Sequence, residues 1–155
     1  MLYPLSYRGL GNQTACGNRT VAAMIRGLMN PKSLSLVFVG AGAGGVLRYL
    51  LALWLNPVLA EVPLGTLAAN VFGCGAAGAL IGLLAEYTSL DMTLRPLLMA
   101  GFLGGLTTFS SFSVEVVQAL EAQRPLLATA IVFLHVGASL AAAIAGLMAV
   151  RALVA

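Results

Sequence analysis

Charged side chains are scarce in this sequence, and that scarcity indicates the class of protein. Only 8% of the 155 residues are Asp, Glu, Lys or Arg, whereas 60% are hydrophobic. Soluble domains carry about 25% charged residues, and a soluble cluster of buried helices would lack the polar surface to stay dissolved. The sequence therefore predicts an integral membrane protein. The net charge of +3 forms no basic cluster, which argues against nucleic acid as a partner.

Residue types that commonly carry out chemistry are also few. The sequence has one histidine and two cysteines, Cys16 in a polar stretch and Cys74 in an apolar run. We expect no disulfide between such different surroundings, and Cys74 is interpreted as a small packing residue. The sequence contains no nucleophile–base pairing, no Gly-rich phosphate loop and no cluster of metal-binding side chains. Enzymatic activity is therefore not expected.

Long apolar runs occupy most of the chain. A membrane-spanning helix needs about 20 largely apolar residues, and four segments qualify: 34–55, 64–85, 93–120 and 125–150. The short loops favour antiparallel neighbours, so we expect an all-α membrane domain of four helices over residues 34–155. Residues 1–33 have no continuous apolar core and are expected to form a poorly ordered extension, with Met24 and Met29 as alternative translation starts.

Glycines spaced four residues apart predict close helix packing, since small-residue faces let helix backbones approach. The pairs are Gly40 and Gly44, Gly78 and Gly82, and Gly101 and Gly105. Packing alone accounts for most of them. Four helices of this size enclose little volume, so a channel or transporter would need a second copy of the chain. Basic residues favour one side only slightly, so the orientation in the membrane is weakly specified.

The third apolar segment contains the stretch GGLTTFSSFS, residues 104–113, which is poor in helix formers. Gly104 and Gly105, followed by Thr107 and Thr108, predict a break in the helix. Broken backbone at membrane depth is tolerated where protein buries it or where it lines a cavity, and the freed carbonyls are ligands for a hard cation such as Na⁺. A glycine kink with threonines bonded back to their own helix is an equal alternative.

Aromatic and hydroxyl side chains alternate after the expected break. Phe109 and Phe112 share a helical face, and the serines among them are Ser110, Ser111 and Ser113. Phenylalanines in membrane helices usually face lipid or pack, and this is the default interpretation. Alternatively, ring edges, the positive rim of the aromatic quadrupole, and hydroxyl donors hold an anion without a full positive charge. Glu115 is then either a pore-mouth carboxylate or a helix-end residue that reaches the headgroups.

Single polar residues stand in the other three segments. Asn70 needs partners because an unpaired buried amide costs on the order of a few kcal/mol. It either joins helices or donates toward a polar track, with Thr66 one turn earlier on the same face. Arg48 lies close enough to its helix end for its stem to reach the interface, which favours a structural or vestibule role. His135 shares a face with Ser139, and a lone membrane histidine more often joins helices than carries protons.

Three motifs together resemble the CrcB-type fluoride ion channels, also called Fluc. They are GAGGVLRY (42–49), GTLAANVFG (65–73) and GFLGGLTTFSSFSVE (101–115), of which the third is the most specific. The resemblance covers all four apolar segments and leaves out the extension. It implies a dual-topology homodimer of antiparallel subunits in the cell inner membrane, with two pathways through which fluoride passively leaves the cytoplasm.

The resemblance also implies roles for individual residues. The fluoride pathway is implied for Asn70, Thr108, Phe109, Ser110, Ser111, Phe112, Glu115 and Ser139. A structural Na⁺ at the dimer interface is implied on the backbone carbonyls of Gly104 and Thr107, and Arg48 matches a first-helix arginine. The chain departs from the family pattern at Ser111, where TTFST is frequent, and at His135, where small hydroxyls are usual.

Two other functions remain open at the level of the sequence. A small proton-coupled exporter of cationic drugs can also be a four-helix, dual-topology dimer. That mechanism requires a carboxylate inside the membrane, typically in the first helix, and residues 34–55 contain none. The third class is an assembly subunit held by its glycine faces, for which purified protein would show no ion flux.

Overall fold

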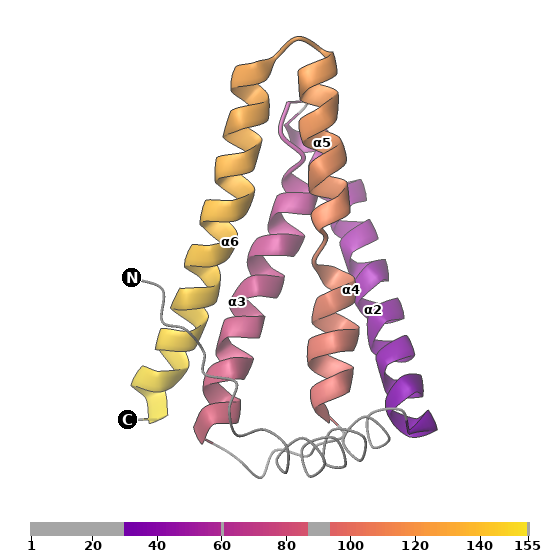
Figure 1. The fold of residues 1–155 in the computed structure, drawn as a ribbon, viewed down its shortest axis with the longest axis vertical. Helices are drawn as coiled ribbons and strands as arrows, with labels where there is room; N and C mark the ends of the chain where they lie inside the picture. The colour runs from indigo at the N-terminus through magenta and orange to yellow at the C-terminus, as the bar shows by residue number, and fades with distance from the viewer. Residues whose placement is uncertain (1–29, 60, 87–93, 155) are drawn as a thin grey trace, which may run out of the picture. The chain divides into compact units, whose positions relative to one another are not determined.

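The computed structural model describes residues 30–59, 61–86 and 94–154, and four helical spans in these ranges are long and apolar enough to cross a membrane. The spans are Pro31–Val58, Leu64–Ala85, Pro96–Glu121 and Pro125–Val154 (Figure 1). No strand occurs among the described residues, which agrees with the predicted all-α membrane class. The first span begins slightly before the predicted start at residue 34. The predicted start of the third span at residue 93, and most of the extension over 1–33, lie outside the described residues.

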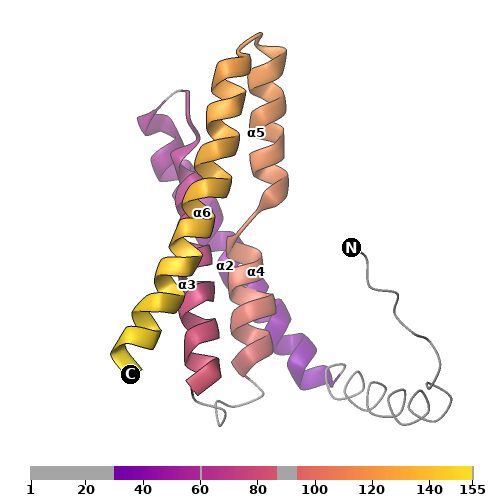
Figure 2. The same ribbon diagram turned by 60° about the vertical axis from the view of Figure 1, so that its left-hand side comes forward.

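The chain is built from helices that pack in pairs. Their bounds are α2 (Pro31–Leu55), η1 (Asn56–Val58), α3 (Leu64–Glu86), η2 (Pro96–Leu103), α4 (Gly104–Leu106), α5 (Phe109–Glu121) and α6 (Pro125–Val154). α3 and α6 pack along one another, and α5 packs against α6 (Figures 1 and 2). The π-helical η2, α4 and α5 together form the third span, and α2 contacts its η2–α4 half.

Side-chain caps explain where the first two spans begin. The Oδ1 atom of Asn30 accepts the backbone N–H of Lys32 at 3.1 Å, and Pro31 occupies the first helical position, where no amide proton is needed. After α2, the Oδ1 atom of Asn56 accepts the N–H of Gly65 at 2.8 Å. This bond satisfies one of the N–H groups that a helix leaves without a partner at its start.

The third span is broken, as predicted, and the break lies at the two threonines that follow the glycine pair. Gly104 and Gly105 are helical, whereas Thr107 and Thr108 have extended backbone, with ψ angles of 148° and 124°. Figure 2 shows this extended connection between α4 and α5. Thr108 caps α5, because its Oγ1 accepts the N–H of Ser111 at 3.2 Å. Thr107 does bond back to its own helix, since its hydroxyl donates to the carbonyl of residue 103 at 2.9 Å.

Glycines let α2 approach the third span at backbone distance. A methyl group on Gly40 would lie 2.5 Å from a main-chain oxygen of η2, and one on Gly105 would lie 2.5 Å from the carbonyl oxygen of Ala41. Contacts this short are sterically forbidden, so both positions require glycine. On α3, Gly78 faces the backbone of α6 in the same way, whereas Gly82 faces the side chain of Val150 on α6, which a methyl group would meet at 3.0 Å. The predicted glycine faces are therefore contact surfaces between helices, as small-residue packing in membranes requires.

The turn between α5 and α6 sets the register of the last helix. Arg124 donates its N–H to the carbonyl of Ala119 at 2.9 Å, and Gln123 donates to Leu120 at 3.0 Å. Gln123 has a positive φ of 57°. This pattern is a Schellman motif with glutamine at the position that usually holds glycine. It allows Pro125 to start α6 directly, so that α6 returns along α5 and α3.

Candidate anion site

Asn70 of α3 is bonded to both main-chain groups of Thr108 at the helix break. Its Oδ1 accepts the N–H of Thr108 at 2.7 Å, and its Nδ2 donates to the carbonyl of Thr108 at 3.0 Å. These two bonds replace helical partners, so the backbone polar groups of Thr108 are satisfied without water. The carboxamide therefore holds the break open. This explains why the break lies at Thr108 and not at the glycine pair.

The capture of Thr108 leaves two carbonyl groups without their usual helical donors. In a continuous helix Gly104 would accept the N–H of Thr108, and Thr107 would accept the N–H of Ser111. The first N–H is donated to Asn70 and the second to the hydroxyl of Thr108. Within the described residues, no other backbone or side-chain donor reaches these two carbonyl oxygens. Both predicted cation ligands are therefore free oxygen atoms, which is the donor type that hard cations prefer.

The side chain of Phe112 is buried between helices, whereas the side chain of Phe109 is exposed on the outer surface of the single chain. Phe112 is 7% exposed and Phe109 is 77% exposed, although their rings meet edge to face with centroids 5.3 Å apart. On its other side Phe112 stacks on the imidazole of His135, with centroids 5.0 Å apart and an interplanar angle of 26°. The two phenylalanines expected to share a face do contact each other, but only one of them is buried in the subunit.

His135 of α6 bonds to the same carboxamide that holds the break. Its Nδ1 atom lies 3.2 Å from the Nδ2 atom of Asn70. Because the Asn70 oxygen already accepts from Thr108, the atom that faces His135 is the amide nitrogen, which can only donate. Nδ1 must then be the acceptor, and the proton of the neutral imidazole is on Nε2. This residue is the helix-joining histidine that the sequence suggested.

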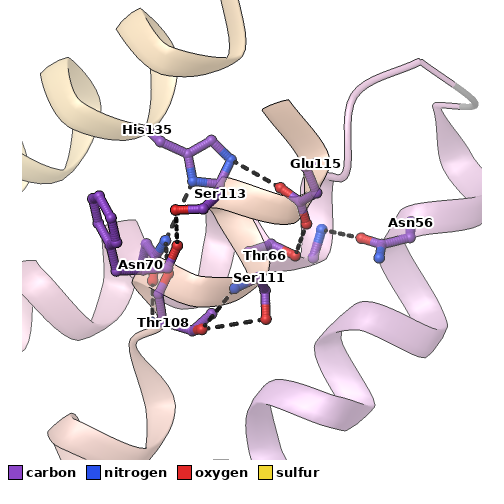
Figure 3. Close-up of polar contacts among 10 residues, drawn as sticks. Asn56, Thr66, Asn70, Thr108, Ser111, Ser113, Glu115 and His135 are labelled. Carbon is purple, nitrogen blue, oxygen red and sulfur yellow. Dashed lines mark hydrogen bonds and ion pairs between the residues drawn. The ribbon is translucent and has the colours of Figure 1, made fainter. Parts of the chain in front are cut away.

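A carboxylate follows on the other side of the imidazole. The Nε2 atom of His135 lies 3.7 Å from the Oε2 atom of Glu115, and the Oε1 atom of Glu115 accepts the hydroxyl proton of Thr66 at 2.5 Å. The side chains of Asn70, His135, Glu115 and Thr66 thus form one polar row from the break toward the start of α3 (Figure 3). The row begins and ends on α3 and passes through α6 and α5 between these ends.

A groove beside this row brings together most of the predicted pathway residues. Its volume is about 270 Å³, and it is lined by Asn70, Cys74, Thr107, Thr108, Phe109, Phe112, His135, Val136 and Ser139. The hydroxyl oxygen of Ser139 is buried and has no hydrogen-bond partner among the described residues. Of the residues that the structure describes, neither lysine nor arginine lines the groove. The groove therefore presents partial positive charges but no side chain with the full positive charge of lysine or arginine.

The remaining predicted pathway residues line a different cavity. Ser110, Ser111 and Glu115 lie with Thr66 and Asn56 on the wall of a cavity of about 500 Å³. This vestibule cavity also contacts the polar row at Glu115. Sequence reasoning placed Ser110 and Ser111 beside the phenylalanines, because it took the helical face from residue spacing alone.

Arg48 has a structural contact at the break. Its Nε atom donates to the carbonyl oxygen of Gly105 at 3.2 Å. That oxygen lies at the C-terminal end of α4, where a positive charge is favourable. This placement fits the structural role expected for Arg48, and it keeps the guanidinium out of both the groove and the vestibule cavity.

Three residues beside the site were not predicted as part of it. His135 was interpreted as a helix-joining group and as a departure from the family pattern, Thr66 as a neighbour of Asn70, and Cys74 as packing. The structure places His135 and Thr66 in the polar row and Cys74 on the groove wall. The available signal was spacing, because Thr66, Asn70 and Cys74 are successive turns of one helical face.

Four membrane spans, a break in the third and an uncharged polar groove define a small multi-pass membrane protein. A family model described as "CrcB-like protein, Camphor Resistance (CrcB)" matches residues 35–147. The chain therefore belongs to the CrcB family. This membership confirms the resemblance drawn from the three motifs, and it agrees with the expectation of a membrane protein that is not an enzyme.

Relatives of this chain carry a more specific name. It is 42% identical over 109 residues to a protein of Desulfovibrio desulfuricans, covering 70% of this chain and 84% of the relative. It is 45% identical over 108 residues to one of Serratia proteamaculans, covering 70% and 85%. It is 43% identical over 122 residues to one of Dechloromonas aromatica, covering 77% and 90%. Each of the three is named "Fluoride-specific ion channel FluC".

Proposed function

We propose that this chain is the subunit of a fluoride-specific channel through which fluoride passively leaves the cytoplasm. The relatives named as fluoride channels support the substrate. The observation that carries the proposal is the groove, where the buried ring of Phe112, the carboxamide of Asn70 and the hydroxyl of Ser139 lie together. Within the described part of the chain, this hydroxyl has no hydrogen-bond partner and no cationic side chain lines the groove.

The groove suits a small, strongly hydrated anion because it replaces water by weak donors. The Ser139 hydroxyl has a proton to donate, and the ring edges present partial positive charge. The hydroxyl of Thr107 is less suitable because its proton goes to the carbonyl of residue 103. A fixed ammonium or guanidinium would bind the anion tightly and slow its release, whereas conduction requires both entry and exit.

The proposal includes a homodimer with a structural Na⁺. A single chain offers two free carbonyl oxygens, on Gly104 and Thr107, whereas hard cations take about six or more oxygen ligands. A second copy would supply an equal pair, which brings the carbonyl ligands to four and would leave the rest of the coordination shell to other oxygen atoms. The exposed Phe109 and the apolar outer face of α2, with Phe38 81% exposed, also leave surface for a second subunit. The cation would add a fixed positive potential at the dimer centre, and replacement of Na⁺ by a large organic cation should weaken the dimer on size exclusion.

Fluoride release from liposomes tests the proposed function. Purified protein should release fluoride, measured with an ion-selective electrode, and should release neither chloride nor an aromatic cation. Export of the aromatic cation would support the drug exporter, and no flux at all would support the assembly subunit. Phe112→Ile should lower the fluoride rate while the oligomeric state is kept. The matched control is Phe133→Ile, since Phe133 is 74% exposed on α6 and does not line the groove.

A further inference from the structure

The carboxamide of Asn70 has two protons, and the structure accounts for both. One goes to the carbonyl oxygen of Thr108 at 3.0 Å, while Oδ1 accepts the N–H of Thr108 at 2.7 Å. This pair alone fixes the orientation of the carboxamide, since the oxygen must face the N–H and the nitrogen must face the carbonyl. The second proton points to the Nδ1 atom of His135, 3.2 Å away. Asn70 therefore has no uncommitted donor for an anion in the groove.

His135 has a second partner close by. Its Nε2–H faces the Oε2 atom of Glu115 at 3.7 Å, just beyond hydrogen-bond range. Both atoms are buried, and neither has a hydrogen-bond partner within the described part of the chain. The imidazole lies flat against Phe112, so movement of the ring within its own plane keeps the stacking contact. His135 can therefore break its hydrogen bond to Asn70 and form a new one to Glu115.

We propose that His135 is a specificity-determining residue that acts as a placeholder acceptor. Its Nδ1 atom holds the second N–H of Asn70 when no anion is bound and releases that N–H to an anion that enters the groove. The displaced imidazole keeps its proton on Nε2 and donates it to Glu115. No proton is transferred at any point. This inference rests on the proposed function and refines it, because the anion gains an oriented donor only by displacing an internal hydrogen bond.

Two substitutions separate the acceptor from the ring. His135→Asn keeps an acceptor at the δ position and loses the aromatic face. His135→Phe keeps the face that stacks on Phe112 and loses the acceptor. The measured quantities are the half-saturating fluoride concentration and the maximal release rate in liposomes, together with the oligomeric state on size exclusion.

The placeholder role predicts opposite results for the two variants. In His135→Phe the N–H of Asn70 no longer has to be displaced, but the bond that the displaced imidazole gains with Glu115 is lost as well. The half-saturating concentration should therefore fall, by at most about 3- to 10-fold, the worth of one net hydrogen bond. The maximal rate should fall as well, because release is slower. His135→Asn should stay within about twofold of the wild type. The reverse pattern would show that only ring packing matters, and a higher half-saturating concentration in both variants would mean that the imidazole itself contacts the anion. Either result overturns the proposal.

A spectroscopic measurement on the unmodified chain avoids the risk that a variant does not fold. The sequence contains a single histidine, so ¹⁵N-histidine labelling gives one imidazole when the affinity tag has no histidine. Without fluoride we expect a protonated Nε2 and a bare, hydrogen-bonded Nδ1. Saturating fluoride should shift the Nδ1 signal, and equal chloride should not. A proton on Nδ1 would contradict the placeholder role alone. So would an Nδ1 signal that fluoride does not shift in protein that conducts fluoride. Absence of fluoride flux from the wild type contradicts the proposed function itself.

Discussion

Replacement of Asn70 by aspartate changes charge and hydrogen bonding in the groove while it leaves the side-chain shape the same. The oxygen that accepts from Thr108 at 2.7 Å is kept. The nitrogen that donates to the Thr108 carbonyl at 3.0 Å and faces His135 at 3.2 Å becomes a carboxylate oxygen. The contact with His135 can be restored, because His135 can move its proton to Nδ1 and donate it to the new carboxylate. The contact with the Thr108 carbonyl cannot recover.

The substitution is expected to reduce fluoride transport more than it reduces the stability of the fold. Loss of one hydrogen bond with its acceptor left buried destabilises a protein by about 1–3 kcal/mol. A fluoride ion in the groove would meet the new charge at about 5 Å, where two like charges repel by roughly 3 kcal/mol at an effective dielectric constant of about 20. Each 1.4 kcal/mol is about tenfold in an equilibrium constant, so anion occupancy should fall by a factor of about 100 for a protein that still folds.

The assay is the initial rate of fluoride release from liposomes, normalised to reconstituted protein. Asn30→Asp is the matched control, because Asn30 accepts the N–H of Lys32 through an oxygen that aspartate retains and lines neither the groove nor the vestibule cavity. Its new charge stands at the start of α2, where a helix N-terminus favours it. We expect the control to fold and conduct, and Asn70→Asp to fold and conduct at about a hundredth of the rate. A folded Asn70→Asp protein that keeps more than a tenth of the wild-type rate would refute the assignment of the groove as the pathway.

Further predictions concern packing, access and the groove hydroxyl. Gly40→Ala should lower the thermal stability in detergent by about 1–3 kcal/mol because its methyl group overlaps the backbone of η2; Gly42→Ala, which has open space around it, should have no effect, and equal melting of the two would contradict the α2 contact. A small thiol-reactive cation should block fluoride release through Cys74 on the groove wall in a Cys16→Ser background, and Cys74→Ser should be resistant. Ser139→Ala should leave stability within about 0.5 kcal/mol, since no protein hydrogen bond is lost, and should still slow release; unchanged release would remove Ser139 from the pathway.

The spans and their contact faces were predictable from the sequence because they depend on local spacing. About 20 apolar residues define a span, and the glycines at positions 40 and 105 fall on contacting faces of α2 and the third span. The position of the break was less predictable. The sequence predicted a break within the stretch from Gly104 to Thr108, but it did not show that the glycines remain helical and serve close packing. A side chain of another helix, Asn70, captures Thr108 and creates the break.

The polar row was not predictable as a unit because its bonds join residues far apart in the sequence. Asn70 and His135 are separated by 65 positions, and Thr66 and Glu115 by 49. Periodicity identifies which residues share a helix face, but it does not show which faces meet. For the same reason the serines after the break were expected near the phenylalanines, whereas Ser110 and Ser111 line the vestibule cavity.

The way protons are shared along the row gives a physical basis for discrimination between halides. The Asn70 protons are bonded to Thr108 and His135, and the Thr66 proton is bonded to Glu115. An anion that enters must therefore offer Asn70 a better acceptor than an imidazole nitrogen. Fluoride is small and concentrates its charge, so it accepts hydrogen bonds strongly, whereas chloride is larger and accepts them weakly. On the proposed function, the hydroxyl of Ser139 is available to either ion, whereas the donors of Asn70 are internally bonded and are released only to the ion that can displace those bonds.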